Sequence, residues 1–593
     1  MQDDNLPVSA YFGDMKSLFS LVLVFTAMQL HAQQLPPVFG ANTKAHTPQL
    51  TRTYLTPQRI VWESGAAHAQ HLLAQRNGQA DLSNRNMCTL EKTGSGILLD
   101  FGREIHGGLQ LITGIYKGNK PVKVRIRFGE SVSEAMSDIG GEKNATNDHA
   151  MRDMIVEVPW LGSLEVGNTG FRFVRIDLVE ENASLPLKEV NAIFVYRDLP
   201  YKGSFHCSDT LLNKIWLTGA YTVHLNMQDY LWDGIKRDRL VWVGDLHPEV
   251  STISAVFGEQ DVVTKSLDLA RDITPLPQYM NGIGAYSMWW VLLHRDWYLH
   301  TGNIRYLREQ STYLKGLLEL LISKIGPDNR EKLDGGSMRF LDWPSSGNEP
   351  AIHAGLHAMM VMTLNAGAEL SKVLGDAATA RQCTEAVARL RQHVPDPNRS
   401  KQAAALLALS GLAPAEKMNR EVIEVDSMRR YSTFFGYYML QAKAKAGDYP
   451  GALRDIRRYW GGMLDLGATT FWEDFNMDWI PNAARIDEPV PADMKDVHGD
   501  YGAHCYIGLR HSLCHGWASG PTAWLTEHVL GIKVTAPGCK VIHVTPHLGD
   551  LAFAEGTFPT PYGIVSVKHT KLPDGKVRST VKGPKEVKII VAK

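Results

Sequence analysis

The chain has 593 residues, a formal net charge of −1 and 14 tryptophans. This length is too great for one ordinary hydrophobic core, so we expect two to four domains. The balanced charge gives no electrostatic footprint for nucleic acid or an anionic membrane, which leaves neutral ligands as the better expectation. Aromatic side chains make up 9 % of the chain, and such rings can stack on flat apolar faces of a ligand as well as fill a core.

The first predicted element is a signal peptide within residues 1–32. In the stretch MKSLFSLVLVFTAMQLHAQQ, Lys16 supplies the positive charge, Leu18–Met28 is apolar, and Ala32 can precede a cleavage site. The apolar run is shorter than the roughly 20 residues that a membrane-spanning helix needs. We therefore predict a misplaced start followed by a secretory signal peptide, export to the periplasm or the extracellular space, and no membrane insertion by the rest of the chain.

Residues 33–205 have the pattern of a β-sandwich. VKVRIRFGES at 122–131 alternates apolar and charged residues, and GFRFVRIDLV at 170–179 repeats this period of two. Such alternation indicates strands with one buried and one wet face. Glycine-rich turns separate these runs, so we predict an N-terminal β-sandwich.

Helical periodicity begins near Ser208, a candidate N-cap, and continues through residues 206–530. Glycines followed by Asn or Asp recur between helical segments at Gly302, Gly375 and Gly447. A glycine suits the left-handed end of one helix, and the following residue can cap the next. Repeated helical hairpins predict an open solenoid or a closed toroid. We favour an (α/α)6 toroid, because a closed ring gathers the aromatic and acidic connections around one cavity.

The last part of the chain, residues 531–593, returns to strands. KLPDGKV contains a Pro-Asp-Gly turn between two alternating runs, which is typical of a hairpin. We predict a small C-terminal β-sandwich packed on the toroid. The whole chain is therefore expected to be a multidomain α+β protein in which two β-domains flank a central helical domain.

The stretch DGIKRDRLVWVGD, from Asp233 to Asp245, is the first candidate site. Its charges alternate with apolar residues, and a half-buried group of carboxylates is costly unless it is paired. The spacing of Asp238, Trp242 and Asp245 predicts that one helical face holds all three. Arg237 can hold one carboxylate ionised while a drier neighbour keeps its proton. The alternative is an ion-paired surface of a helix.

A second acidic candidate lies in GATTFWEDFNMDW, where Glu473 follows Trp472. Two carboxylates from distant segments, each beside a tryptophan, provide what glycoside hydrolysis needs: one protonates the leaving oxygen and the other activates water or attacks the sugar. The alternative for Glu473 alone is a structural carboxylate at a helix N-terminus or in an ion pair.

These segments resemble the bacterial α-L-rhamnosidases of glycoside hydrolase family 78. The resemblance extends over FLDWP, SLCHGWASGPTAWL, LLDFGREIHGGLQL and APGCKVIHVTP, and it covers nearly everything after the predicted signal peptide. It implies a six-hairpin glycosidase toroid and an exo-acting, inverting reaction that removes terminal α-L-rhamnose, with Asp238 as the acid and Glu473 as the base. The chain departs from the family at Asp238, where a glutamate is usual, at Val241, where a glycine is usual, and in the late segment, where Cys514 and Trp517 stand in unusual places.

The resemblance also implies a set of substrate-binding residues. They are Asp233, Arg237, Trp242, Asp245, Asp342, Trp343, Trp472 and His515. Two rival functions remain open: a related toroid glycosidase for another deoxy or uronic sugar, and a non-catalytic carbohydrate-binding protein.

We expect a carbohydrate partner and no cofactor. The histidines lack the H-E-x-x-H spacing of a zinc helix and the six cysteines form no C-x-x-C pair, so no metal site is predicted. Phosphate-binding glycine motifs and a G-x-S-x-G elbow are absent from the sequence as well. The sequence carries no indication of the oligomeric state.

Overall fold

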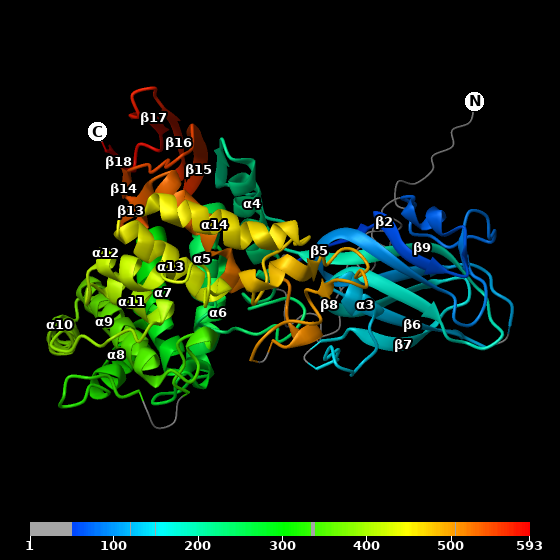
Figure 1. Ribbon diagram of the computed structural model, residues 1–593, viewed down its shortest axis with the longest axis horizontal. Helices are drawn as coiled ribbons and strands as arrows, with labels where there is room; N and C mark the ends of the chain where they lie inside the picture. The colour runs from blue at the N-terminus through cyan, green and yellow to red at the C-terminus, as the bar shows by residue number, and fades with distance from the viewer. Residues whose placement is uncertain (1–49, 119, 149, 334–337, 505, 593) are drawn as a thin grey trace, which may run out of the picture. The chain divides into compact units, whose positions relative to one another are not determined.

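The computed structural model of the chain (Figure 1) describes residues 50–592 except 119, 149, 334–337 and 505. The predicted misplaced start and signal peptide, residues 1–32, lie outside the described residues. No helix in the described segments combines the length and the apolar character that crossing a membrane requires. From the N-terminus onward, a β-domain, a ring of helices and a second, smaller β-domain follow one another.

The N-terminal β-domain is one hydrogen-bonded sheet with a large buried core and a second, small apolar cluster of Leu98, Val132, Ala135 and Phe173. Its long strands β5 and β8 extend through two halves of the sheet and pair with each other in both. In the first half β5 also pairs with β2, up to Asp100, and in the second half it pairs with β9, from Gly107 onward. Apolar side chains from both halves fill one buried cluster, which is how the predicted sandwich is realised. The elements are β1 (Thr51–Leu55), β2 (Arg59–Ser64), β3 (Ala66–Ala67), β4 (Cys88–Leu90), β5 (Gly96–Thr113), β6 (Val122–Gly129), helix α3 (Val132–Met136), β7 (Asp153–Val158), β8 (Ser163–Leu178) and β9 (Leu185–Tyr196).

The central domain is a closed toroid of two concentric layers of helices. Helices α5, α7, α9, α11 and α13 contact one another in turn, and α15 contacts both α13 and α5, which closes the inner ring. The remaining helices lie outside this ring. The helices are α4 (Thr210–Asn226), α5 (Leu246–Val256), α6 (Asp261–Asp272), α7 (Gly284–Thr301), α8 (Ile304–Ser323), α9 (Glu349–Leu374), α10 (Ala377–Leu390), α11 (Lys401–Ser410), α12 (Ala415–Met418), α13 (Thr433–Lys445), α14 (Tyr449–Asp465) and α15 (Gly520–Trp524).

The composition of each helix explains its layer. Inner helix α7 is buried on nearly every side, from Gly284 through Leu293, because it contacts neighbours in the ring and the outer layer together. Outer helix α8 buries only residues at spacings of three and four, such as Leu307, Gln310 and Leu314. A helix that is apolar all round belongs inside a domain, whereas an amphipathic one covers its surface.

The predicted helix boundaries at the three glycines are confirmed. Gly302, Gly375 and Gly447 have φ of 68°, 82° and 77°, and each separates two helices. The residue after each glycine caps the next helix through its side chain; for example, Asp376 accepts a hydrogen bond from the Thr379 amide. The predicted cap at Ser208 is wrong by one residue, because Asp209 caps α4.

We expect Gly302→Ala to destabilise the protein more than Gly375→Ala. Both substitutions place an L-residue in the left-handed region, which costs roughly 1–2 kcal/mol. A Cβ on Gly375 would meet nothing within 4 Å, whereas one on Gly302 would lie 2.8 Å from the Cα of Gly538 in the C-terminal domain. Urea denaturation of the two variants measures the difference, and equal losses would show that the close approach of Gly302 to Gly538 carries no strain.

The C-terminal β-domain consists of two small sheets. One sheet has the order β10-β15-β16-β17 and the other β13-β14-β18. Strand β10 (Ser204–Cys207) precedes the toroid in sequence but pairs with β15 (Phe553–Thr560), which follows it. The C-terminal domain therefore includes one strand from the segment before the toroid. The other strands are β13 (Ile532–Ala536), β14 (Val541–Val544), β16 (Gly563–Lys571), β17 (Val577–Lys582) and β18 (Lys588–Val591).

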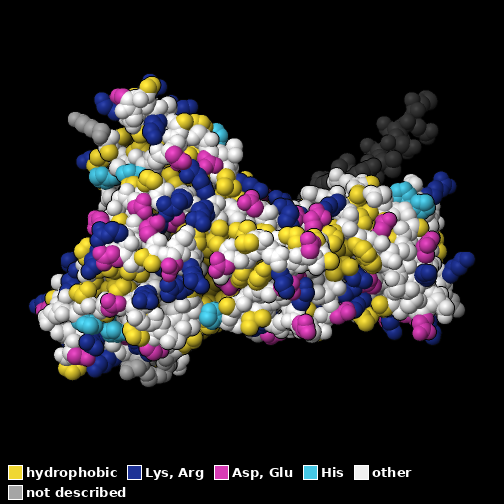
Figure 2. Space-filling model, in the orientation of Figure 1, with side chains coloured by type: hydrophobic (Ala, Val, Ile, Leu, Met, Phe, Trp, Pro, Cys, Tyr) yellow, Lys and Arg dark blue, Asp and Glu magenta, His cyan; other side chains and the backbone are white. Residues whose placement is uncertain are grey.

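The visible surface has no large region of a single charge. Figure 2 shows Lys and Arg side chains interspersed with Asp and Glu over the visible surface, as expected for a net charge of −1. The five described cysteines are all buried and unbridged.

Candidate active site

A cavity of about 230 Å³ opens at one end of the toroid. Its walls come from Tyr286 in the first turn of α7 and from connections that lead from an outer helix to the following inner helix: α4 to α5, α6 to α7, α8 to α9 and α14 to α15. A closed ring brings these connections together, as predicted from the hairpin pattern. The lining residues are Asp233, Arg237, Asp238, Trp242, Asp245, Ile283, Tyr286, Met338, Phe340, Trp343, Glu473, Tyr506, His515 and Trp517.

The connection from α4 to α5 is a compact loop, and the prediction of a helical face for Asp238, Trp242 and Asp245 is wrong. Asp238 and Arg239 have φ of 55° and 56°, which no helix accommodates. The loop closes on Asp233, whose amide donates to the Leu240 carbonyl and whose carboxylate accepts from the Leu240 amide at 3.0 Å. Arg239 does not line the cavity; its side chain donates to the Asn168 carbonyl in the β-domain at 2.6 Å. Tertiary contacts therefore overrule the helical spacing.

Arg237 joins the two predicted catalytic carboxylates. Its Nη1 lies 3.2 Å from Asp238 Oδ1, and its Nη2 lies 2.6 Å from Glu473 Oε1. Burial opposes the charge of the guanidinium, but Glu473 and Asp238 outweigh this and raise the pKa of Arg237. The two segments, 236 residues apart in sequence, thus meet at one cation.

A second ion pair continues from Glu473 across the cavity. His515 Nε2 lies 3.0 Å from Asp245 Oδ1, and His515 Nδ1 lies 3.8 Å from Glu473 Oε1. Burial opposes protonation of His515, but the charges of Glu473 and Asp245 outweigh it and raise the pKa of the imidazole to about 9. Both ring nitrogens therefore carry protons at neutral pH, and Nδ1 has no hydrogen-bond partner among the described residues.

We expect protonated His515 to stabilise the fold in a pH-dependent way. Its folded-state pKa of about 9 exceeds the ordinary value of 6.5, so its contribution is complete below about pH 6.5 and is lost as the pH rises through about 9. The shift corresponds to on the order of 3 kcal/mol. Urea denaturation of the wild type and His515→Gln between pH 6 and pH 10 should show a stability difference that shrinks with rising pH. A constant difference would mean that His515 is neutral throughout.

Burial shifts the pKa of several carboxyls at the cavity. It raises the pKa of Asp233 well above the ordinary value of an aspartate, and the charges of Asp245 and Asp238 add to this effect against the opposing charge of His515. Burial likewise raises the pKa of Asp245, and that of Glu249 well above its usual range. The cavity therefore contains Asp233, whose protonated form is favoured, as well as Glu473, which is bound to an arginine.

Aromatic rings form a continuous belt around these charges. Neighbouring rings in the belt have centroids between 5.0 and 6.4 Å apart. In order, the rings are Trp242, Tyr286, Phe340, Trp343, Tyr506 and Trp517. The cavity thus combines apolar walls with a few convergent polar groups, the usual composition of a small-ligand site.

The structure brings together eight of the ten residues predicted from the sequence, and two lie elsewhere. The Asp342 side chain accepts from Ser432 and Gln402 behind the wall, and burial raises its pKa to about 7. Trp472 is buried against Phe475 in the toroid core. Sequence reasoning missed Tyr286, Phe340 and Tyr506, which have no distinguishing local pattern.

One group among the described residues has the spacing of metal ligands: Glu130, Glu134 and His498. It lies outside the cavity lining. The cavity itself contains two carboxyls, Asp238 and Glu473, joined by Arg237, and a third, Asp233, whose protonated form is favoured by burial. Such a set of carboxyls can carry out acid/base chemistry on a bound ligand.

Two parts of the chain match known domain families. Residues 200–419 match the bacterial alpha-L-rhamnosidase 6 hairpin glycosidase domain, and residues 531–592 match the bacterial alpha-L-rhamnosidase C-terminal domain. A curated Alpha-L-rhamnosidase from Alteromonas sp. (strain LOR) is 24 % identical over 529 residues, covering 81 % of this chain and 54 % of that protein. The chain therefore spans about half the length of this relative.

Solved structures share the fold. A GH78 family rhamnosidase of Bacillus sp. GL1 matches with a TM-score of 0.70 and 21 % identity, over 88 % of this chain and 55 % of its own. A rhamnosidase from Klebsiella oxytoca with rhamnose bound matches with a TM-score of 0.61 and 20 % identity, over 83 % of this chain and 98 % of its own. The central toroid between two β-domains is thus the architecture of known rhamnosidases.

Proposed function

Because the chain belongs, through these two domains, to the bacterial α-L-rhamnosidase family, we propose that it removes terminal α-L-rhamnose from a glycan or glycoside by an inverting acid/base mechanism. The observation that carries the proposal is the bridge made by Arg237 between Asp238 and Glu473 inside one small cavity. The proposal requires no cofactor.

Glu473 is the proposed general base. Arg237 lies 2.6 Å from Glu473 Oε1 and the Ser512 amide donates to Glu473 Oε2 at 3.2 Å, so both oxygens of the carboxylate that would accept a proton from water are held by donors. The protonated Nδ1 of His515 lies 3.8 Å from the same carboxylate oxygen. A water molecule between them could donate to Glu473 and accept from His515, which would orient it for attack.

An inverting mechanism predicts the separation of the two carboxyls. Inverting glycosidases hold their two carboxyl groups about 6.5–9.5 Å apart, so that a water fits beside the sugar. Asp238 and Glu473 bind different nitrogens of the Arg237 guanidinium, so both carboxyls lie on one cation in the cavity. We expect their separation to fall within the inverting range.

Asp238 is the proposed proton donor, and Asp233 is the second candidate. The resemblance favours Asp238, but its contact with Arg237 favours the ionised carboxylate. Asp233 lines the same cavity, and burial raises its pKa well above the ordinary value of an aspartate, which favours the protonated form that a proton donor needs. The candidates differ in an experiment described in the Discussion.

The cavity fits one sugar ring. Its volume of about 230 Å³ is below the range of about 300–1,000 Å³ for sites that hold drug-sized ligands, which suits an exo-acting enzyme. The aromatic belt can contact the apolar C6 methyl group and ring face of a deoxy sugar. Arg237 and His515 are neutralised by carboxylates, which disfavours the carboxylate of a uronic sugar.

A panel of nitrophenyl glycosides tests the proposal. We expect turnover of the α-L-rhamnoside alone, and proton NMR of the first product should show the inverted anomer. Turnover of a different deoxy or uronic glycoside would identify the related toroid glycosidase, and binding of rhamnose without any turnover would identify a carbohydrate-binding protein.

We further propose that the protein is exported to the periplasm or the extracellular space. The support is the charged residue Lys16 followed by the apolar run Leu18–Met28. Expression of the full chain in a bacterium, followed by fractionation and N-terminal sequencing, should yield an exported protein that begins shortly after Ala32. A full-length cytoplasmic product would contradict export.

A further inference from the structure

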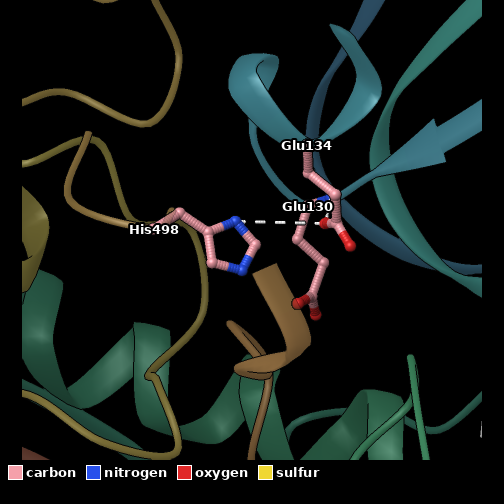
Figure 3. Close-up of side chains that lie close together, drawn as sticks. All are labelled: Glu130, Glu134 and His498. Atoms are coloured by element: carbon pink, nitrogen blue, oxygen red, sulfur yellow. Dashed lines mark hydrogen bonds and ion pairs between the residues drawn. The ribbon is translucent and has the colours of Figure 1, made fainter. Parts of the chain in front are cut away.

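A buried cluster of charges connects the N-terminal β-domain with the loops of the cavity. Figure 3 shows the carboxylates of Glu130, which follows β6, and Glu134, which lies in α3, beside the imidazole of His498. All three side chains are at most 1 % exposed. Charges buried so completely need partners, because each is costly in a low-dielectric interior.

The partner is Lys236, the residue next to Arg237. Its Nζ lies 3.0 Å from Glu130 Oε2 and 3.2 Å from Glu134 Oε1, so an ammonium group occupies the position that a metal ion would take between the carboxylates. Burial opposes this charge, but the two glutamates outweigh it and raise the pKa of Lys236.

His498 is engaged in a different way. Its Nδ1 lies 2.7 Å from the Ser131 hydroxyl, and its Nε2 lies 2.9 Å from the His511 carbonyl, to which it can only donate. Burial lowers the pKa of the imidazole to about 4, so the ring is neutral and both nitrogens are used. No lone pair is left for a metal, and the cluster is best described as an internal ion pair.

The cluster reaches the proposed base through a short peptide segment. Lys236 donates to the carbonyls of Leu509 and His511, and Glu130 accepts from the Leu513 amide at 2.7 Å. The intervening Ser512 amide donates to Glu473 Oε2 at 3.2 Å. Two consecutive amides of one segment therefore point to Glu130 on one side and to Glu473 on the other.

We propose that Glu130 and Lys236 are positioning residues for the reaction. Lys236 fixes the backbone next to Arg237, and Glu130 fixes segment 509–515, so that Arg237 and Ser512 hold the Glu473 carboxylate in its working position. The β-domain thereby contributes to the geometry of a site that it does not line. The effect on kcat rests on the proposed function, whereas the effect on the mobility of segment 509–515 does not.

Hydrogen exchange tests the structural consequence without substrate. We expect Glu130→Gln to accelerate exchange in a peptide that covers residues 509–515, measured by mass spectrometry. The matched control is Asp177→Asn, another buried carboxylate of the β-domain, whose partners are Arg127 on the neighbouring strand β6 and Arg175 on its own strand β8. It should leave this peptide unchanged. Equal exchange in the wild type and Glu130→Gln, or equal acceleration in both variants, would overturn the proposal.

Kinetics tests the functional consequence. We expect Glu130→Gln to reduce kcat by about 10- to 100-fold with little change in KM, because a displacement of about 1 Å at a reacting group can cost 10²-fold. Asp177→Asn should retain wild-type kcat. A fall in kcat that matches between the two variants would indicate general destabilisation and would overturn the proposal.

A paired variant separates positioning from folding. Lys236→Met alone leaves two buried carboxylates without their cation and can prevent folding. Lys236→Met/Glu130→Gln removes the cation together with one of its two carboxylates, and the other, Glu134, keeps the ion pair with Arg152 at 3.7 Å. We expect the paired variant to fold with a thermal midpoint near that of the wild type and still to lose kcat. Recovery of wild-type kcat would overturn the positioning role. A wild type that turns over no rhamnoside would instead contradict the proposed function, while the exchange experiment still decides the structural claim.

Discussion

Glu473→Gln should abolish most of the turnover on every α-L-rhamnoside, whatever its leaving group. A general base activates water in all cases, and the loss of a positioned acid/base residue costs on the order of 10² to 10⁴ in rate. Glutamine keeps the shape of the side chain but cannot accept the proton. Steady-state kinetics with a nitrophenyl rhamnoside and an alkyl rhamnoside should therefore show equal relative losses in kcat.

Addition of azide provides the control for this variant. Azide is an anion that attacks without a base, so it should restore part of the turnover of Glu473→Gln and yield the inverted glycosyl azide. The wild type should not be accelerated by azide. Small losses in Glu473→Gln without azide rescue would contradict the assignment and leave Glu473 as the structural partner of Arg237.

Asp238→Asn should have an effect that depends on the leaving group. A nitrophenolate leaves with little protonation, whereas an alkoxide needs a proton from the acid, so the loss should be on the order of 10² to 10⁴ for alkyl rhamnosides and small for nitrophenyl ones. A plot of log kcat against leaving-group pKa should become steeper in the variant than in the wild type.

The corresponding variant of Asp233 decides between the two candidate acids. If Asp233 donates the proton, Asp233→Asn will show the leaving-group dependence and Asp238→Asn will lose activity equally on all substrates. Asp238→Glu restores the residue that is usual in the family. Activity that appears only in Asp238→Glu would mean that the natural protein has lost the reaction. Equal small losses in Asp233→Asn and Asp238→Asn would mean that the carboxyls of the cavity form a structural ion-pair network.

The fold was predictable wherever short-range signals decide the conformation. A glycine followed by Asn or Asp at Gly302, Gly375 and Gly447 specifies both a helix end and the next helix start, and no distant contact is needed to interpret it. The alternation in residues 122–129 similarly fixes β6. The arrangement of the two halves of the N-terminal sheet was not predictable, because it depends on the pairing of β5 with strands far away in sequence.

The site was predictable in its members and not in its geometry. Asp238 and Asp245 satisfy a helical spacing, but the contacts of Asp233 and Arg239 impose a loop that includes two residues with positive φ. Trp472 adjoins Glu473 in sequence, yet it packs in the core while Glu473 faces the cavity. Neighbours along an irregular segment need not share an environment. The position of Trp472 next to Glu473 in the sequence therefore led to the wrong prediction that Trp472 lines the cavity.

The cluster around Lys236 shows the limit of motif reasoning. Ser131 and Glu134 have the spacing of a helix capping box, and Ser131 does accept from the Glu134 amide. This local pattern does not predict that the Oε1 atom of Glu134 accepts a hydrogen bond from Lys236, which lies about 100 residues further along the chain. Long-range ion pairs of this kind leave no periodic signal.

Strand β10 has a consequence for the order in which the protein can fold during synthesis. It is made before the first helix of the toroid, but its partner β15 follows about 350 residues later. At about 5–20 residues per second, a ribosome needs roughly 20–70 s to supply that partner. During this interval the backbone groups of β10 are unpaired and can recruit another strand. The nascent chain is therefore expected to depend on a chaperone until its last domain has emerged.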